Sequence, residues 1–277
     1  MSFHINHKVP HREGTALSRR YGDNVPETLK LLTYNIQAAI GTSRYLHYVT
    51  RSWRHVLPDW RGIQRLDDIG RVITEYDLVA LQEVDGGSLR SSFINQLAYL
   101  AKLCDFDYCY QQLNRDFGKL GQFSNGILSR FVPYEVEDHK LPGLKGRGAI
   151  VAKYGNGKHP LVLVGVHLAL SERARYRQLD YLRDLVQGYE HVIVMGDMNC
   201  RGDQIIDTPL RDTHLIQVKE EHHTFPSWKP DRNIDHIMVS PTLQIKEVQV
   251  LECTHSDHRP IAMEVVLPPQ VRDAFYD

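Results

Sequence analysis

The amino-acid sequence predicts a mixed α/β (α+β) fold in a single main domain. Short apolar runs rich in Val, Ile and Leu recur between residues 29 and 267, with amphipathic segments between them. No internal repeat, low-complexity segment or interdomain linker divides the chain. Apolar runs of this length are typical of buried strands, and 277 residues are enough to bury a substantial core. We expect an N-terminal arm over residues 1–28 and a folded domain over residues 29–270.

The apolar runs predict strands that continue almost to the C-terminus. Several runs are continuous apolar blocks, which indicates central strands of a sheet covered on both faces. The predicted strands are 29–36, 77–84, 125–130, 149–154, 160–170, 191–199, 234–240, 245–251 and 259–267.

Three segments between the predicted strands have apolar residues at helical spacing. In SFINQLAYLAKLC, one face carries Phe93, Leu97, Leu100 and Cys104. In SERARYRQLDYLRDLVQG, the first serine can cap the start of a helix and the last glycine can end it. The predicted helices are 66–76, 92–104 and 171–188.

The composition restricts the class of protein. The formal net charge of −1 gives no overall attraction to nucleic acid or anionic membrane, so any affinity for phosphate must be local. No stretch approaches the roughly 20 apolar residues that span a bilayer, and the polar N-terminus lacks the apolar core of a secretory signal. The four cysteines have neither zinc-type spacing nor the density of a disulfide scaffold. We therefore expect a cytoplasmic monomer with reduced thiols and no obligate protein partner.

One connection, residues 44–65, has a distinctive composition. It carries five Arg, two His, two Trp and two Tyr against one Asp. Basic residues interleaved with aromatic ones suit contacts to a phosphate backbone and stacked bases, or to lipid headgroups. The alternative is an ordinary excursion whose rings pack on the domain and whose Arg side chains are solvated. If this segment lines the site, Arg51, Trp53 and Arg54 should affect substrate selectivity.

Polar residues interrupt the predicted strands at or near their ends. A carboxylate or amide buried at a strand terminus is costly unless it is paired or bound to a cation. Carboxylates together with an Asn amide oxygen are hard ligands, which suit Mg²⁺ or Mn²⁺ rather than Zn²⁺. A hard cation, carboxylates and His on one site suit hydrolysis of a phosphate ester. The interrupting residues are Asn35, Gln82, Glu83, His167, Asp197, Asn199, Asp235, His236, Asp257 and His258.

Alternation along an extended chain separates neighbouring polar side chains. Asp257 and His258 should point in opposite directions and serve different partners, and His236 should face away from Asp235. If Asp235 accepts an N–H of His258, it fixes the tautomer and raises the pKa of the imidazole. A charged His258 would then stabilise the transition state rather than accept a proton.

The ordered set of motifs resembles the endonuclease/exonuclease/phosphatase superfamily, metal-dependent phosphoesterases similar to pancreatic deoxyribonuclease. A single motif such as GDMN is a weak signal, but seven in the family's order, each at a predicted strand end, are specific. The resemblance implies a four-layer αββα sandwich, with two mainly antiparallel β-sheets packed face to face and flanked by helices. The motifs are TYNIQ, LQEVD, SNGILS, GVHLAL, GDMN, IDHI and SDHRP, which span about residues 30–267.

The resemblance also implies roles for single residues. Glu83 would be the principal ligand of Mg²⁺ or Mn²⁺, with Asn35 beside it and Asp257 completing or supporting the coordination. Asp197 and Asn199 would orient the attacking water and hold the non-bridging oxygens. The implied catalytic set is His167, Asp197, Asn199, Asp235 and His258.

Asn125, Arg90 and Arg147 are expected to contact the substrate. Asn125, in SNGILS, would bind phosphate; the alternative is an amide that caps a strand turn. Arg147 and Lys145 lie in a Gly-rich turn that suits a phosphate, although an ordinary exposed turn fits equally well. Arg90 follows Glu83 closely and would face the substrate.

Together these observations predict a Mg²⁺-dependent phosphoesterase that hydrolyses a P–O bond by in-line attack of an activated water. A phosphodiester, in nucleic acid or a phospholipid headgroup, is the first expectation, and a small soluble or inositol phosphomonoester is the alternative. A catalytically silent binding module of the same fold is disfavoured, because every expected site residue is present. The general base stays open between Asp197 and His258.

Overall fold

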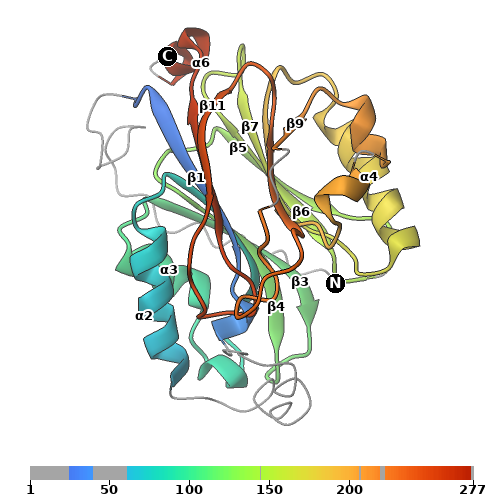
Figure 1. The fold of residues 1–277 in the computed structure, drawn as a ribbon. Helices are drawn as coiled ribbons and strands as arrows, with labels where there is room; N and C mark the ends of the chain where they lie inside the picture. The colour runs from blue at the N-terminus through green and yellow to red at the C-terminus, as the bar shows by residue number, and fades with distance from the viewer. Residues whose placement is uncertain (1–24, 40–60, 144, 206, 219–221, 276–277) are drawn as a thin grey trace.

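The apolar runs form two six-stranded β-sheets in the computed structural model (Figure 1). Most of the predicted arm and most of the segment 44–65, including Arg51, Trp53 and Arg54, lie outside the described residues. The structure describes residues 25–39, 61–143, 145–205, 207–218 and 222–275.

In the first sheet, β1 (Thr28–Asn35) lies between a parallel neighbour, β2 (Leu78–Asp85), and an antiparallel neighbour, β12 (Ile261–Val266). The first predicted strand therefore pairs with the last. The full order is β11 (Gln244–Val250), β12, β1, β2, β4 (Gln122–Ser129) and β3 (Tyr108–Asp116).

The second sheet is built around the parallel pair β7 (Leu161–His167) and β8 (His191–Asp197), both buried at every position. On its other side β8 pairs antiparallel with β10 (Asp235–Val239). Apart from β1–β2 and β7–β8, the described strand pairs of both sheets are antiparallel. The full order is β5 (Glu135–Lys140), β6 (Gly148–Tyr154), β7, β8, β10 and β9 (Ile216–Gln217).

Three clusters of buried apolar residues fill the spaces between the layers of the molecule. Between the sheets, apolar residues of both meet, among them Leu31 of β1 and Leu163 of β7. The helices α2 (Arg61–Ile73) and α3 (Gln96–Leu103) cover the outer face of the first sheet, and α4 (Glu172–Val186) covers that of the second (Figure 1). The four-layer αββα sandwich that the resemblance implies is confirmed.

Three strands, β3, β5 and β9, were not predicted from the sequence. Each lies at an edge of its sheet. The sequences YCYQQLNRD of β3 and EVEDHK of β5 are largely polar. An edge strand has one unpaired side and tolerates charged residues, so apolar runs do not mark it.

The three predicted helices are present, with shifted ends. α3 starts after Asn95, whose side chain accepts a hydrogen bond from the Ala98 backbone N–H at 3.0 Å. Phe93 lies before this start and is 60% exposed, so its predicted place on the buried helix face is wrong. α4 begins after Ser171, as expected, but the Ser171 side chain forms no capping hydrogen bond; Gly188 follows the end of the helix with a φ of 95°. The shorter helices are η1 (Gln37–Ala39), η3 (Leu89–Ser91), α5 (Gly202–Ile205), η4 (Pro209–Asp212) and α6 (Pro269–Ala274).

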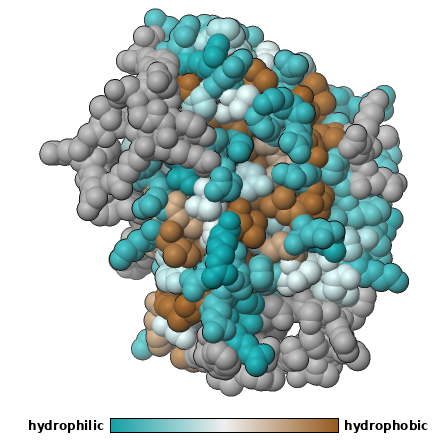
Figure 2. Space-filling model, turned by 60° about the vertical axis from the view of Figure 1, so that its left-hand side comes forward, coloured by the Kyte–Doolittle hydropathy of each residue, from teal (hydrophilic) through white to brown (hydrophobic). Residues whose placement is uncertain are grey.

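The packed structure continues beyond residues 29 and 270. Val25, within the predicted arm, and Val271, in α6, are both buried in the cluster between the sheets. The four cysteines are free and buried. None of the described helices combines the length and the hydrophobicity that crossing a membrane requires. On the face drawn in Figure 2, hydrophobic residues form separate patches between hydrophilic ones.

Candidate active site

Strand register brings the polar strand ends together. At the end of β1, Asn35 lies beside Gln82 of β2, and at the end of β7, His167 lies beside Asp197 of β8. Asp235, at the start of antiparallel β10, is the register partner of Asp197. A hydrogen bond from Asn35 to Asp197 joins the two sheets at this edge. The central strands of both sheets therefore supply one site.

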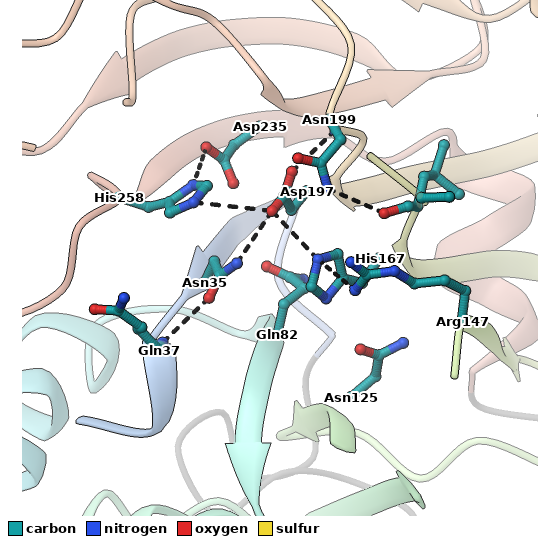
Figure 3. Close-up of polar contacts among 12 residues, drawn as sticks. Asn35, Gln37, Gln82, Asn125, Arg147, His167, Asp197, Asn199, Asp235 and His258 are labelled. Carbon is teal, nitrogen blue, oxygen red and sulfur yellow. Dashed lines mark hydrogen bonds and ion pairs between the residues drawn. The ribbon is translucent and has the colours of Figure 1, made fainter. Parts of the chain in front are cut away.

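Asp197 is at the centre of this site (Figure 3). Its Oδ2 accepts a hydrogen bond from Asn35 Nδ2 at 3.0 Å, and its Oδ1 accepts one from the Asn199 backbone N–H at 2.9 Å. The Nε2 atoms of His167 and His258 lie 3.5 and 3.9 Å from Oδ2. Burial raises the pKa of Asp197 to about 7, although the positive charge of His258 opposes this shift. This carboxylate can therefore exchange a proton near neutral pH.

A buried carboxylate holds His258. His258 Nδ1 donates to Asp235 Oδ2 at 2.8 Å, and Thr224 Oγ1 donates to the same oxygen at 2.5 Å. Burial alone would lower the pKa of His258, but Asp235 and then Asp197 outweigh it and raise the pKa to about 10. The expected hydrogen bond and the expected direction of the shift are both present. His258 is an imidazolium, with the ring of Phe225 packed against it at a centroid distance of 4.8 Å.

Asp197, Asp235 and His258 are also close enough to surround a cation, since one ligand atom of each lies within 4.8 Å of the others. Both ring nitrogens of an imidazolium carry protons, so His258 has no lone pair for a metal in this state. In this state His258 forms a hydrogen bond with Asp235 and a longer ion-pair contact, of 3.9 Å, with Asp197.

Ser256 fixes the segment that carries Asp257 and His258. Its Oγ donates to the backbone oxygen of Asn35 at 2.7 Å, and its own backbone oxygen accepts from Ser227 Oγ at 2.6 Å. The segment is thereby tied to β1 and to the loop before β10. Asp257 and His258 are 6% and 5% exposed. His258 bonds to Asp235, and the charges of both Asp257 and His258 act on Glu83, so the two neighbouring residues contribute to one site.

Glu83, Asn35 and Asp257 have the donor chemistry for a hard divalent cation. Glu83 has a φ of 56° where the pairing of β2 with β4 shifts register, which turns it out of the regular strand. Burial and then the charge of Asp257 raise the pKa of Glu83, so two carboxylates share a poorly solvated space. Asn35 Oδ1 accepts one hydrogen bond from the Gln37 backbone N–H at 3.1 Å and keeps a second lone pair. A cation would relieve the repulsion of the carboxylates, and this oxygen donor set suits Mg²⁺ or Mn²⁺.

Arg147 and His167 form the opposite wall of the site (Figure 3). Arg147 Nη1 donates to His167 Nε2 at 2.7 Å. A guanidinium carries only donors, so Nε2 accepts and the imidazole is neutral. Burial and the positive charge of Arg147 hold the pKa of His167 well below its usual range. Burial also lowers the pKa of Arg147, against the charges of Glu83 and Asp197, which places this guanidinium beside the predicted metal and catalytic groups.

Two amides of the predicted set are fixed by backbone contacts. Asn125 Nδ2, on β4, donates to the Gly148 carbonyl of β6 at 3.1 Å, so the amide bridges the two sheets and does not cap a turn. Asn199 Nδ2 donates to the Leu168 carbonyl at 3.0 Å. In each amide the side-chain oxygen is thereby oriented by the fold.

Arg90 is not open to the site, contrary to the prediction from the sequence. Its side chain is 2% exposed and forms a buried ion pair with Asp85 through Nε. Its guanidinium lies 3.9 Å from the centroid of the Phe123 ring. These contacts give Arg90 a structural environment, in which it holds the loop after β2.

Thr224 and Gln37 belong to the site but carried no signal in the sequence. Thr224 bonds to Asp235 from a loop with no periodic pattern, and Gln37 positions Asn35 through its backbone N–H. A backbone donor is independent of side-chain identity, so only the folded chain reveals it. His236 faces away from Asp235, as expected, and bonds through Nε2 to the Cys200 carbonyl at 2.8 Å.

Comparison with known proteins identifies a family and a shared fold. The model of the Endonuclease/Exonuclease/phosphatase family matches residues 32–258. No curated protein matches the chain significantly.

Several solved structures share the fold. An endonuclease/exonuclease/phosphatase from Beutenbergia cavernae DSM 12333 is 20% identical with a TM-score of 0.66, over 87% of this chain and 72% of that chain. A mannosyl-6-phosphatase from Bacteroides thetaiotaomicron VPI-5482 is 18% identical with a TM-score of 0.63, over 86% and 100%. A humanized D. rerio TDP2 is 16% identical with a TM-score of 0.61, over 87% and 99%. At such identities these structures show a common fold, and because the family model covers most of the sequence, the chain belongs to the endonuclease/exonuclease/phosphatase family.

Proposed function

We propose that this protein hydrolyses a phosphodiester by in-line attack of water, with Mg²⁺ or Mn²⁺ as its cofactor. Membership of a family whose enzymes generally act on phosphoester bonds supports the reaction class. The observation that carries the proposal is the meeting of Asp197, Asn35 and His258 at one point between the two sheets. A carboxylate, an oriented amide and a cationic imidazole suit the attack of water on phosphorus.

Asp197 is the group best placed to accept the proton of the attacking water. Asn199 holds its Oδ1 and Asn35 holds its Oδ2, so its lone pairs have fixed directions. A base with a pKa of about 7 is well matched to neutral pH. His258 is already protonated, which leaves Asp197 as the proposed general base.

His258 and Arg147 are the proposed electrostatic partners of the phosphoryl oxygens. They lie on opposite sides of Asp197, and both are cationic donors (Figure 3). Negative charge spreads over the equatorial oxygens in the transition state of phosphoryl transfer. Fixed donors in a partly buried site stabilise that charge without reorganising.

A divalent cation held by Glu83, Asn35 and Asp257 would neutralise charge on the phosphoryl group as a Lewis acid. The role of these residues is to present oxygen atoms from a fixed backbone. The bulge at Glu83 and the Ser256 hydrogen bond to β1 set their positions.

Phosphomonoester hydrolysis is the alternative, and the similarity to a structure named as a mannosyl-6-phosphatase keeps it open. A terminal phosphate carries about 1.5 to 2 negative charges near pH 7, whereas a diester carries one per phosphate. Arg147 and His258 are already engaged with His167 and Asp235. This limited positive charge favours the diester, in nucleic acid or in a phospholipid headgroup.

A substrate panel tests the proposal. The protein is incubated with Mg²⁺ or Mn²⁺ and plasmid DNA, abasic duplex, single-stranded RNA, phospholipids, inositol phosphates or a sugar 6-phosphate. We expect product from a diester, loss of product in EDTA and recovery on adding Mg²⁺. Glu83→Gln and Asp197→Asn should each lower the rate by a factor of about 10² or more, whereas His214→Ala, at an exposed position, should not.

Four outcomes would count against this function or its mechanism. Full turnover in EDTA would contradict the proposed role of the metal ion. Full turnover of Asp197→Asn would contradict the role of Asp197 as the general base. Product from monoesters alone would select the alternative. If no substrate gave product although metal was bound, a catalytically silent binding module of the same fold would be the better explanation.

A further inference from the structure

The geometry points to a second cation site, for a borderline transition-metal ion such as Zn²⁺, formed by His159, Glu190 and His191. We call these three residues the His–Glu site. One ligand atom from each lies within 4.8 Å of the others. His159 and Glu190 are exposed, whereas His191 is 0% exposed.

The fold places the His–Glu site far from the candidate active site. His191 opens β8 and is the register partner of Leu161, the first residue of β7, so His159 lies just before that strand. Asp197 ends the same β8 strand six residues later. At a rise of about 3.3 Å per residue, the two ends are roughly 20 Å apart. An ion bound at one end does not share ligands with an ion at the other.

The hydrogen bonds around Thr242 favour one tautomer of His191. Thr242 Oγ1 donates its proton to the Glu190 backbone carbonyl at 3.1 Å. The same hydroxyl lies 2.9 Å from His191 Nδ1, so it accepts the Nδ1 proton. In a neutral imidazole the other nitrogen then carries a lone pair. A hydrogen bond at one ring nitrogen commonly orients the other toward a metal.

The second ring nitrogen of His191, Nε2, is buried. Among the described residues this buried atom has no hydrogen-bond partner. Its near neighbour is Glu190 Oε2, at 3.7 Å, which is also an acceptor. A buried acceptor that faces a carboxylate oxygen without a donor between them is unfavourable unless a cation lies there.

The donor set selects the kind of cation. Two imidazoles and one carboxylate suit Zn²⁺ and similar ions, whereas Mg²⁺ prefers oxygen ligands only. Around Zn²⁺, with bonds of about 2.0–2.1 Å, neighbouring ligand atoms are separated by about 3.4 Å. In the structure the ligand atoms lie within 4.8 Å of one another, so they must approach to about 3.4 Å around Zn²⁺. The exposed side chains of His159 and Glu190 can rotate to do this, while buried His191 stays in place.

Zn²⁺ uptake by the 277-residue chain tests the inference. Equilibrium dialysis is run with excess Mg²⁺ to fill the hard-ligand site, and bound Zn²⁺ is measured for the parent, His159→Ala, Glu190→Gln and the control His214→Ala. These substitutions are at exposed positions, which protects the fold. We expect the first two variants to lose one bound Zn²⁺, or to bind it at least about tenfold more weakly, while His214→Ala matches the parent.

A thermal-shift measurement gives a second readout. Zn²⁺ should raise the melting temperature of the parent and of Glu83→Gln, because an ion that binds only the native state stabilises it, and should raise that of His159→Ala less. Equal uptake and equal shifts in parent, His159→Ala and His214→Ala would overturn the site and leave a simple His191–Glu190 ion pair. Hydrolysis is not measured, so this result is independent of the proposed function.

Discussion

At the scale of single residues, Asp235 sets both the orientation and the charge of His258. Its Oδ2 accepts the Nδ1 proton of His258 and the Thr224 hydroxyl, and the residue is 1% exposed. In Asp235→Asn the neutral amide cannot support the imidazolium, so we expect a rate loss of about 10²- to 10⁴-fold. The pKa of His258 should also fall, and the alkaline limb of the pH–rate profile should move to lower pH.

Thr224→Val is the matched control for this experiment. It removes one hydrogen bond to Asp235 but leaves the carboxylate and its charge in place. We expect a loss of less than about tenfold and no shift of the alkaline limb. If Asp235→Asn and Thr224→Val had the same pH–rate profile, the charge of Asp235 would have no role in the reaction.

At the scale of elements, the loop between β2 and α3 is organised by a buried ion pair. The Asp85 carboxylate accepts hydrogen bonds from the Gly87 and Ser88 backbone N–H groups at 2.8 and 2.6 Å, and it pairs with Arg90. Burial opposes ionisation, but Arg90 and the Ser88 contacts outweigh it and lower the pKa of Asp85. Arg90→Met would leave a buried carboxylate without its cation, which typically costs about 3–5 kcal/mol of stability.

Arg90→Met and Arg147→Met should therefore behave in opposite ways. In denaturant unfolding, the free energy of unfolding of Arg90→Met should fall by about 3–5 kcal/mol. Its KM should stay near the parent value. Arg147, at the active site, should lose rate or substrate affinity with a smaller loss of stability. A raised KM in Arg90→Met without loss of stability would instead support the prediction that Arg90 contacts the substrate.

The elements differ in how well the sequence predicts them. Central strands such as β7 and β8 are apolar throughout because both faces are buried, and a single sequence shows this directly. The edge strand β5 has no such constraint and reads as a loop. Phe93 has helical spacing from Leu97, but the Asn95 cap starts the helix between them. Apolar periodicity therefore predicts packing better than it predicts ends.

At the scale of the whole molecule, the site is formed by strands of both sheets, and the sequence does not show which strand belongs to which sheet. The polar strand ends were visible as candidate site residues, yet their contacts cross from one sheet to the other. Asn35 bonds to Asp197, and Asn125 bonds to Gly148, between strands far apart in the chain. Local patterns carry no information on sheet membership, so the meeting of these residues followed only from the family resemblance and is visible in the folded chain.

The stability of the whole molecule should depend on pH through the buried His236. This residue is 6% exposed, and burial lowers its pKa from the usual 6.5, against the hydrogen bond to the Cys200 carbonyl. Since the native state holds His236 neutral, the unfolded chain binds more protons below pH 6.5. The contribution of this group to stability is therefore lost as the pH falls from 6.5 toward the native pKa.

His236→Gln keeps an N–H donor for Cys200 but does not titrate. Urea unfolding at several pH values between about 5 and 8 should give a flatter profile for His236→Gln than for the parent, with the two curves separating below the usual His pKa. Parallel curves would mean that His236 binds protons equally in the native and unfolded states.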